Sequence, residues 1–274
     1  MDIYELKCFG IDKLGGNPAL VIVDGPPDAQ ARQAFAQDAK LSACVFVDPG
    51  SAGAAWTLDY FYPHMRSPLC LHATLAAGKI LLAGGNGPLA VRTALRGQAL
   101  QLTRSGNQVF AALAPQTAPE VVPGPGEAGL GGLARRLLAP PGQGHGPALA
   151  SAPALASVGS PKLLAEVADS ATLQALAPDL AAIHDWGKAQ GVSGVYAWCR
   201  RPDGAFEGRN FNHLDPALED SATGVAAGAL TLHLGHGIRL YQGANRGQPC
   251  LLQTALAAGQ VLVGGNAMPV PGAP

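Results

Sequence analysis

Two segments of the sequence, 150 residues apart, carry side chains that can transfer protons at matching positions. FYPHMRSPLCLHATLAAG begins at Phe61 and FNHLDPALEDSATGVAAG begins at Phe211, and the two align without a gap. In this alignment Cys70 matches Asp220, and His72 follows Cys70 by two residues. A thiol, an imidazole and a carboxylate can each take up or release a proton during catalysis. The pattern therefore indicates an internal duplication with a proton-transfer group in each copy.

In each copy the reactive residue is expected at the start of a helix rich in small residues. The first turn of a helix presents N–H groups and a partial positive charge, which together favour a carboxylate or a phosphate. Two such helix starts, brought together, would hold a small anionic ligand. The alternative is purely structural: His72 and Asp220 cap their helices, and Cys70 is a small buried residue. The occurrence of these residues in two matched copies favours the catalytic interpretation.

Apolar runs that alternate with turn signals predict a β-rich chain in two halves, which must position these helices. The first half is predicted to hold strands near 2–9, 19–23, 44–48, 57–62, 89–91, 100–103 and 109–113, and helices over 29–39 and 73–82. Residues 114–153 are rich in Pro and Gly and mark a boundary. The second half is predicted to hold helices over 130–138, 179–190 and 223–234, and strands near 154–158, 162–167, 194–199, 206–210, 251–257 and 260–263. The predicted domains are residues 1–118 and 119–274.

The composition excludes several classes of partner. The 274 residues have a net charge of −1 and only 14% charged side chains, without a Lys/Arg cluster, so neither nucleic acid nor an anionic membrane surface is an expected partner. The start MDIYELKCFG does not have the features of a signal peptide, and no run of about 18 apolar residues occurs, so we expect a cytoplasmic protein. The five cysteines are widely spread without a CxxC pair, which argues against disulfides and a zinc site.

No metal or cofactor is expected either. Residues 124–129 (GPGEAG) fit the nucleotide-binding pattern G-x-G-x-x-G, but they lie in the Pro-rich region without the context of a parallel sheet. His233 and His236 lie at a predicted helix end with no third metal ligand near them in the sequence.

Motifs along nearly the whole chain resemble those of the PhzF (phenazine biosynthesis-like) family, which belongs to the diaminopimelate epimerase and proline racemase superfamily. The resemblance rests on these stretches, in the order of the chain: GGNPALVIVDG, LSACVFV, DYFYP, PLCLHATLAAG, GSPKLL, GVSGVY, RNF, EDSATGVAAGAL, QG and VLVGGNAMPV. It implies an α+β fold of two similar diaminopimelate-epimerase-like domains. Each domain is then a curved β-sheet or barrel around a central helix, and the active site lies in the cleft between the domains. It also implies a homodimer.

The resemblance implies a catalytic set of which this chain keeps only a part. The family's His falls on His72 and its Asp on Asp220, but its Glu position holds Ala43 and its Ser position holds Val225. The Gly before the family's His is Leu71, the Pro after its Asp is Ser221, and a Thr-Gly-Glu stretch reads His64-Met65-Arg66. The family Glu is taken to be the general acid/base that moves a proton between carbons, and alanine cannot do so.

Other groups must then transfer the proton, or the chemistry is lost. We expect the catalytic residues to be Asp220, His72 and Cys70, with a mechanism led by Asp220 and His72; a pair formed by Cys70 and Asp220 is the alternative. Arg66 is either a receptor for a substrate carboxylate or a solvated loop arginine, and Asn17 either orients substrate or satisfies its turn. The expected substrate-binding residues are Asn17, Ala43, Cys44, His64, Arg66, Leu71, Ala73, His213, Ser221, Thr223, Gly224 and Val225.

The function expected from the resemblance is a cofactor-independent isomerase that shifts a proton or double bond in a small cyclic or amino-acid-like carboxylate. The altered site favours a natural-product pathway, such as antibiotic biosynthesis. A catalytically inactive ligand-binding protein, or a lyase or hydrolase that uses the same cleft, are the alternatives.

Overall fold

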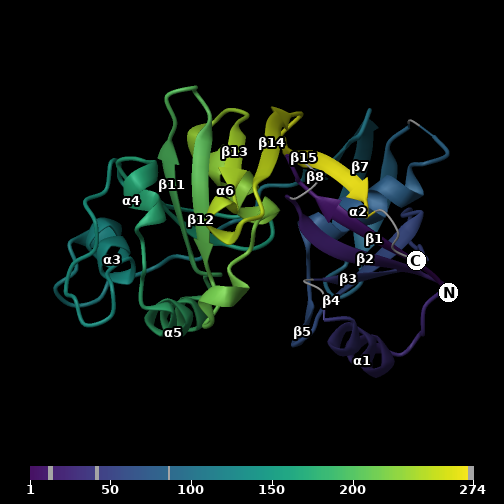
Figure 1. Cartoon of the computed structure of the whole chain (residues 1–274), viewed down its shortest axis with the longest axis horizontal. Coiled ribbons are helices and arrows are strands. Elements are labelled where there is room, and N and C mark those ends of the chain that lie inside the picture. Colours follow the sequence, from purple (N-terminus) through teal and green to yellow (C-terminus); the bar gives the residue numbers. More distant parts are fainter. Residues whose placement is uncertain (12–14, 41–42, 86, 271–274) are drawn as a thin grey trace. The chain divides into compact units, whose positions relative to one another are not determined.

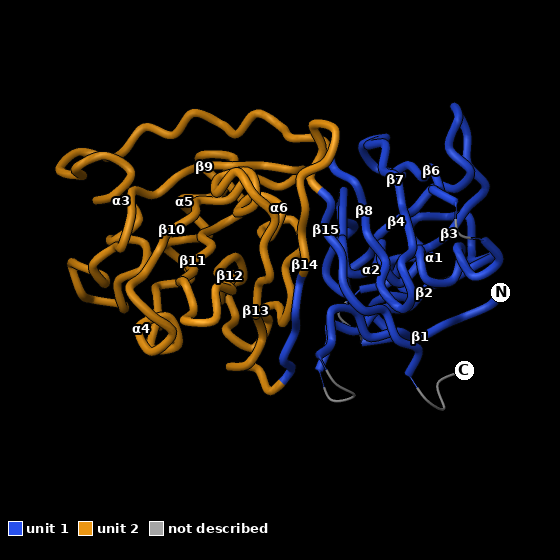
Figure 2. The backbone as a smooth tube through the Cα atoms, turned by 90° about the horizontal axis from the view of Figure 1, so that it is seen from above, with its two compact units in different colours: residues 1–113, 248–252, 262–274 blue, residues 114–247, 253–261 orange. Residues whose placement is uncertain are grey.

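The computed structural model describes residues 1–11, 15–40, 43–85 and 87–270, which form two compact units (Figures 1 and 2). Unit 1 comprises residues 1–113, 248–252 and 262–274, and unit 2 comprises residues 114–247 and 253–261. The predicted domains, 1–118 and 119–274, are continuous, whereas unit 1 also takes in the C-terminal residues. The reason is that the last strand pairs with the first, as described next. Leu41 and Ser42 of the LSACVFV motif lie outside the described residues.

In unit 1, eight strands of the described residues form a closed barrel. Their order is β1 (Asp2–Cys8), β2 (Asn17–Val23), β3 (Cys44–Pro49), β4 (Trp56–Tyr62), β6 (Leu89–Thr93), β7 (Ala99–Ser105), β8 (Gln108–Leu113) and β15 (Gln260–Pro269). The barrel closes because β15 also pairs with β1, with Cys8 opposite Ala267. The short strand β5 (Met65–Ser67) pairs with β4. Helix α1 (Ala29–Ala39) contacts β4 and begins where Asp28 accepts a hydrogen bond from the Ala31 N–H at 2.8 Å.

Helix α2 (Leu71–Leu81) is the central helix of unit 1 (Figure 1). Its residues 71–78 are all buried, and it contacts β1, β2, β3, β7 and β8. A helix buried on all sides needs small side chains where strands approach closely. At Gly78 a Cβ atom would lie 2.8 Å from Val109 Cγ1, which explains the glycine. The small residues Ala73, Ala76, Ala77 and Gly78 therefore allow the strands to pack closely around the helix.

In unit 2 the strand order is β14 (Cys250–Ala257), β13 (Arg239–Gln242), β12 (Phe206–Phe211), β11 (Val195–Arg200), β10 (Lys162–Glu166) and β9 (Ala154–Ala156). Its central helix α6 (Gly224–Leu234) contacts β9 and β10. The helices α3 (Gly129–Leu137), α4 (Ser170–Gln174) and α5 (Leu180–Gln190) contribute Leu133, Leu173 and Ile183 to one hydrophobic core with β10 and β11. Two 3-10 helices, Pro216–Leu218 and Ala244–Arg246, lie in the loops before α6 and β14.

The two units repeat the same pairing scheme, which bears out the duplication indicated by the sequence. In unit 1, β1–β2 is antiparallel, β2–β3 parallel, β3–β4 antiparallel and β4–β6 parallel. In unit 2, β9–β10, β10–β11, β11–β12 and β12–β13 follow the same sequence of directions. Strand β12 begins at Phe206, 150 residues after Trp56, the first residue of β4. The expected α+β fold of two similar halves is therefore present.

The two helix starts depart from that equivalence. Helix α2 begins at Leu71, so Cys70 is its N-cap residue. Helix α6 begins at Gly224 with Thr223 as N-cap, so three residues separate Asp220 from the helix. The interpretation of Asp220 as a helix cap is wrong for this reason.

Candidate active site

Three of the expected residues meet at the start of α2 in unit 1. Cys70 Sγ lies 3.3 Å from His72 Nδ1, and Asn17 Nδ2 lies 3.3 Å from the same ring nitrogen. Asn17 is the first residue of β2, which contacts α2, so the barrel itself brings the amide to the imidazole. All three side chains are buried. Asn17 therefore contacts a proposed catalytic side chain rather than only its own turn.

Burial determines the protonation state of His72. It lowers the pKa of this histidine to about 4, so the ring is neutral at pH 7. An amide nitrogen only donates hydrogen bonds, so Nδ1 accepts from Asn17 and the ring proton lies on Nε2. In this state His72 accepts a hydrogen bond at Nδ1, and Nε2, which lies 3.6 Å from Cys70 Sγ, is the ring nitrogen that can donate.

The position of the missing Glu cannot transfer a proton. Ala43 is fully buried, and its carbonyl accepts a hydrogen bond from the Leu20 N–H at 2.9 Å. Burial raises the pKa of the neighbouring Cys44 thiol to about 12, which argues against Cys44 as a base at neutral pH. Leu71 and Ala73 are both buried in the first turn of α2.

The β4–β5 hairpin holds His64 and Arg66. The His64 ring stacks on Tyr62, with centroids 5.8 Å apart. Arg66 donates to both carboxylate oxygens of Asp59, from Nε at 2.8 Å and Nη2 at 3.0 Å. The buried Arg32 also binds Asp59, at 3.0 Å. Arg66 is therefore part of an ion-pair network that was not predicted from the sequence. That Arg66 binds a substrate carboxylate stays a prediction.

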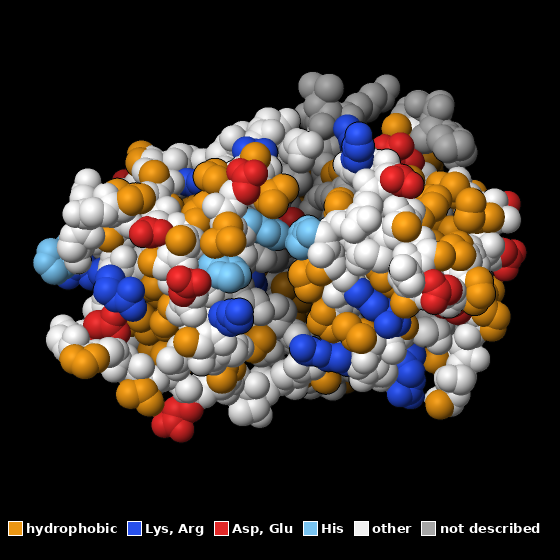
Figure 3. Space-filling model, turned by 90° about the horizontal axis from the view of Figure 1, so that it is seen from below, with side chains coloured by type: hydrophobic (Ala, Val, Ile, Leu, Met, Phe, Trp, Pro, Cys, Tyr) orange, Lys and Arg blue, Asp and Glu red, His pale blue; other side chains and the backbone are white. Residues whose placement is uncertain are grey.

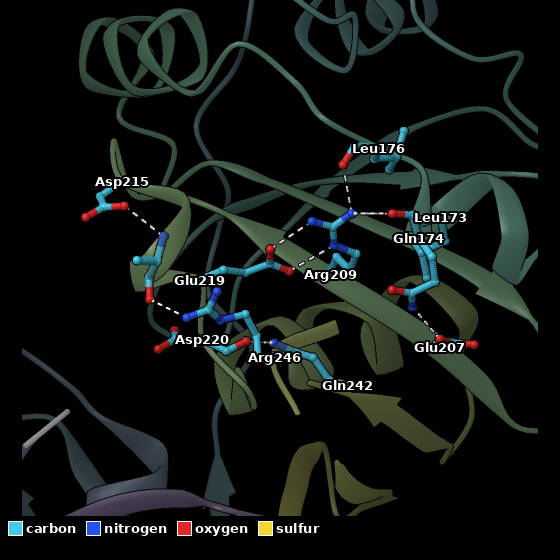
Figure 4. Close-up of polar contacts among 11 residues, drawn as sticks. Leu173, Gln174, Leu176, Glu207, Arg209, Asp215, Glu219, Asp220, Gln242 and Arg246 are labelled. Carbon is cyan, nitrogen blue, oxygen red and sulfur yellow. Dashed lines mark hydrogen bonds and ion pairs between the residues drawn. The ribbon is translucent and has the colours of Figure 1, made fainter. Parts of the chain in front are cut away.

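The residues around Asp220 in unit 2 form a second hydrogen-bonded group (Figure 4). Thr223 Oγ1 donates to Asp220 Oδ2 at 3.4 Å. Gln242, at the end of β13, donates from Nε2 to the Asp220 carbonyl at 2.8 Å and to Thr223 Oγ1 at 3.1 Å. Its Oε1 accepts from the Thr223 N–H at 3.2 Å. Gln242 was recognised in the sequence only as part of a motif, without a role.

The remaining residues expected in this part of the site lie at the start of α6. Ser221 is 3% exposed, and its Oγ has no hydrogen-bond partner within the described structure. Gly224 is buried and Val225 half-buried in the first helical turn. The first turn of a helix has N–H groups without partners inside the helix, so this turn suits an anion.

A buried lysine in the same unit was not singled out from the sequence. Lys162 is 1% exposed at the start of β10, and its Nζ donates to the Ser193 carbonyl. Burial lowers the pKa of Lys162 to about 8, while the charge of Asp220 opposes that shift. The lysine therefore adds a positive charge to the surroundings of Asp220.

Unit 2 also contains a mostly apolar cavity of about 370 Å³. His213 lines it, together with Leu176, Leu180, Arg209, Phe211 and Glu219 among others. His213 thus lines this cavity of unit 2, and its part in substrate binding stays a prediction.

Among residues 1–11, 15–40, 43–85 and 87–270, no group of three or more His, Cys, Asp or Glu is arranged to hold a metal ion. No helix in that same part of the chain is long and apolar enough to cross a membrane. On the face shown in Figure 3, acidic and basic side chains are interspersed.

A closed strand barrel around a buried helix, followed by a second unit whose strands around α6 repeat the same sequence of directions, defines an epimerase-like fold. Solved structures share it. A predicted epimerase from Pseudomonas aeruginosa has a TM-score of 0.75 at 24% identity, covering 97% of this chain and 96% of that one. A hydroxyproline epimerase from Agrobacterium vitis, with bound trans-4-hydroxy-L-proline, has a TM-score of 0.59 at 14% identity, covering 97% and 90%.

The family assignment rests on sequence. The phenazine biosynthesis-like protein family (PhzC-PhzF) matches residues 6–272, and the chain belongs to it. A relative from Deinococcus radiodurans, named an uncharacterized isomerase, is 29% identical over 267 residues, which cover 91% of this chain and 81% of the relative.

Proposed function

We propose that the protein is a cofactor-independent isomerase that moves a proton between carbons of a small carboxylate. The single observation that carries the proposal is the placement of Asp220. This carboxylate falls on the family's Asp position and lies just before the first turn of α6, where N–H groups suit a substrate anion. The names of the relatives, isomerase and epimerase, support the same reaction class.

Asp220 acts as the proton-transfer group in this proposal, and His72 assists it. As a base, Asp220 removes a proton from a carbon next to an electron-withdrawing group, and returning that proton to another carbon completes the isomerisation. The neutral His72, donating from Nε2, can hydrogen-bond a carbonyl or carboxylate oxygen as charge develops on it. Cys70, in contact with His72, is the alternative second acid/base.

The substrate is proposed to be a cyclic or amino-acid-like carboxylate. The neighbour from Agrobacterium vitis contains bound trans-4-hydroxy-L-proline, a ligand of this kind. Ala43 and Val225 replace two polar family residues, which supports a substrate of specialised, natural-product metabolism rather than a housekeeping amino acid. Homodimerisation and a cytoplasmic location remain predictions.

Ala43 also favours a second candidate, a ligand-binding protein that has lost catalysis. The position of the family Glu is fully buried and occupied by a methyl group, so no proton can be exchanged there. Such a protein would bind the carboxylate without turning it over.

Proton NMR in deuterium oxide separates the two candidates. The protein is incubated with a panel of cyclic and amino-acid carboxylates that includes L-proline and trans-4-hydroxy-L-proline. Deuterium entering one carbon with the wild type, and not with Asp220→Asn, supports the isomerase. Asp215→Asn is the matched control, since this exposed aspartate of the same loop caps the 3-10 helix Pro216–Leu218 by accepting from the Ala217 N–H. Binding shifts without exchange would favour the inactive binding protein.

A further inference from the structure

The segment that carries Asp220 has no regular secondary structure of its own. Residues 219–223, here called the Asp220 segment, follow the 3-10 helix Pro216–Leu218 and end where α6 begins at Gly224. Neither a helix nor a strand ladder therefore fixes the backbone of Asp220. Its placement depends on side chains that reach the segment from other elements.

Gln242 holds the segment from β13. Its Nε2 donates to the Asp220 carbonyl, and its Oε1 accepts from the Thr223 N–H, so one side chain binds both ends of a four-residue stretch. Tyr196 of β11 donates its hydroxyl to the same Oε1 at 3.0 Å. Two donors at Oε1 and an acceptor carbonyl at Nε2 leave only one orientation of the amide. The buried glutamine is thus itself held in place.

Arg209 holds the segment from β12 through Glu219. The pair is bidentate, with Nε at 3.0 Å from Oε1 and Nη2 at 2.9 Å from Oε2 (Figure 4). Nη1 donates to the carbonyls of Leu173, Gln174 and Leu176, at 3.1, 3.2 and 2.8 Å, at the end of α4. The planar guanidinium, which also lies over the Phe211 ring, is engaged along all its edges. Glu219 therefore has one well-defined position next to Asp220.

Neither of these contacts uses the carboxylate of Asp220. Arg209 binds the side chain of the preceding residue, and Gln242 binds the main chain of Asp220 itself. The backbone is thus held at two adjacent residues by contacts that do not involve the carboxylate, which accepts a hydrogen bond from Thr223. A third contact of the same loop, from Arg246 Nη2 to the Ala217 carbonyl at 2.7 Å, acts three residues earlier in the chain and outside the Asp220 segment.

We propose that Arg209 and Gln242 are positioning residues for catalysis: together they fix the backbone of Asp220 so that its carboxylate meets the reacting carbon. This role rests on the proposed function of Asp220 in proton transfer. A displacement of about 1 Å in such a group lowers turnover by about 100-fold. Loss of either contact should therefore lower kcat much more than it raises KM, because in this proposal both residues act on the backbone of Asp220.

The test compares three variants by deuterium incorporation, with the carboxylate of the panel that the wild type exchanges. Gln242→Glu has the same shape but replaces the donor to the Asp220 carbonyl by an oxygen, and Arg209→Lys keeps the charge but loses the planar fork. Arg246→Gln is the matched control, since it removes the contact to Ala217 and leaves the Asp220 segment untouched. We expect kcat to fall 10- to 100-fold in the first two variants, on the order given above, with KM within about threefold and the control at the wild-type rate.

The outcomes separate the two proposals. If Gln242→Glu and Arg209→Lys fold and incorporate deuterium at the wild-type rate, the positioning role is wrong but the proposed function stands. The same holds if Arg246→Gln loses as much of the exchange rate as these two variants. A wild type that exchanges no carboxylate overturns the proposed function and the positioning role with it. If Arg209→Lys does not fold, Glu219→Gln carries the same test, because it removes the charge pairing while keeping the shape of the side chain.

Discussion

The two central helices place their reactive residues in different ways. In unit 1 the reactive residue is the N-cap itself, so the helix geometry positions Cys70, and the Thr74 hydroxyl bonds the Cys70 carbonyl at 2.8 Å. In unit 2, Asp220 precedes its helix by a short irregular segment, and Gln242 and Arg209 reach in from two strands. Two copies of a duplicated fold can thus keep the same strand pairing and still use different contacts to hold their reactive side chains. The difference between the two units predicts four measurable effects of decreasing size.

The largest effect is expected on proton exchange. Asp220→Asn should lower the rate of deuterium incorporation by about 1,000-fold, within the range that a general acid/base contributes. Cys70→Ser should lower it by about 10-fold, an estimate for an assisting group that still hydrogen-bonds His72. NMR in deuterium oxide measures both. Equally large losses would instead assign the two-group mechanism in which Cys70 and Asp220 act as base and acid.

The second effect concerns the two ion-pair networks. Arg209→Ala leaves the buried side chain of Glu219 without its ion-pair partner, removes a donor to three carbonyls of unit 2, and should lower the free energy of unfolding by about 3–5 kcal/mol. Arg66→Ala should cost about 1 kcal/mol or less, because its side chain is 34% exposed and Asp59 keeps Arg32. Urea denaturation with unchanged m-values measures the difference. Similar losses in the two variants would contradict the contrast between the units.

The third effect is a pH dependence of stability with a different window in each unit. His72 has its folded pKa lowered to about 4, so the unfolded chain binds the extra proton and stability falls as the pH drops from about 6.5 to about 4. Lys162 has its folded pKa lowered to about 8, so stability rises as the pH increases from about 8 to about 10.5. Each shift corresponds to about 3 kcal/mol.

Urea titrations at several pH values check these windows. His72→Gln should flatten the acid window only, and Lys162→Met should flatten the alkaline window only. A wild-type protein whose stability is constant from pH 8 to 10.5 would contradict the lowered pKa of Lys162.

The smallest effect is expected at Ser221. Its buried hydroxyl has no partner in the described structure, so Ser221→Ala removes an unsatisfied group and should change stability by less than about 1 kcal/mol, in the stabilising direction. Thermal unfolding measures it. A raised KM in the same variant would identify the hydroxyl as a substrate contact, whereas destabilisation would contradict the absence of a partner.

Much of the fold could be predicted from local sequence signals. Helix α1 has the predicted bounds, because Asp28 is a strong N-cap and a polar face follows it. The elements β5, β13 and α4 were not predicted, since they are three, four and five residues long and too short to show a period. The predicted last strand ends at 263, but β15 continues to Pro269.

The candidate site was predicted in its reactive residues but not in the contacts that hold them. Cys70, His72 and Asp220 are visible in the repeat, and the contact between Cys70 and His72 is local. Gln242 lies 22 residues from Asp220, and parallel pairing of β12 with β13 brings its strand to the site. Contacts of this kind leave no periodicity in the sequence. An ungapped alignment also cannot show that α6 begins three positions later than α2.

The strand that closes the barrel, β15, affects the order in which the two units can fold during synthesis on the ribosome. Domains generally fold as units in the order of synthesis, the N-terminal one first. Here β1 must pair with β15, whose last residue is Pro269. The barrel of unit 1 can therefore close only after residues up to Pro269 have left the ribosome. Residues 114–247, which lie between, are complete earlier. Most of the second unit is therefore synthesised while the first still has unpaired strand edges, and such edges favour aggregation.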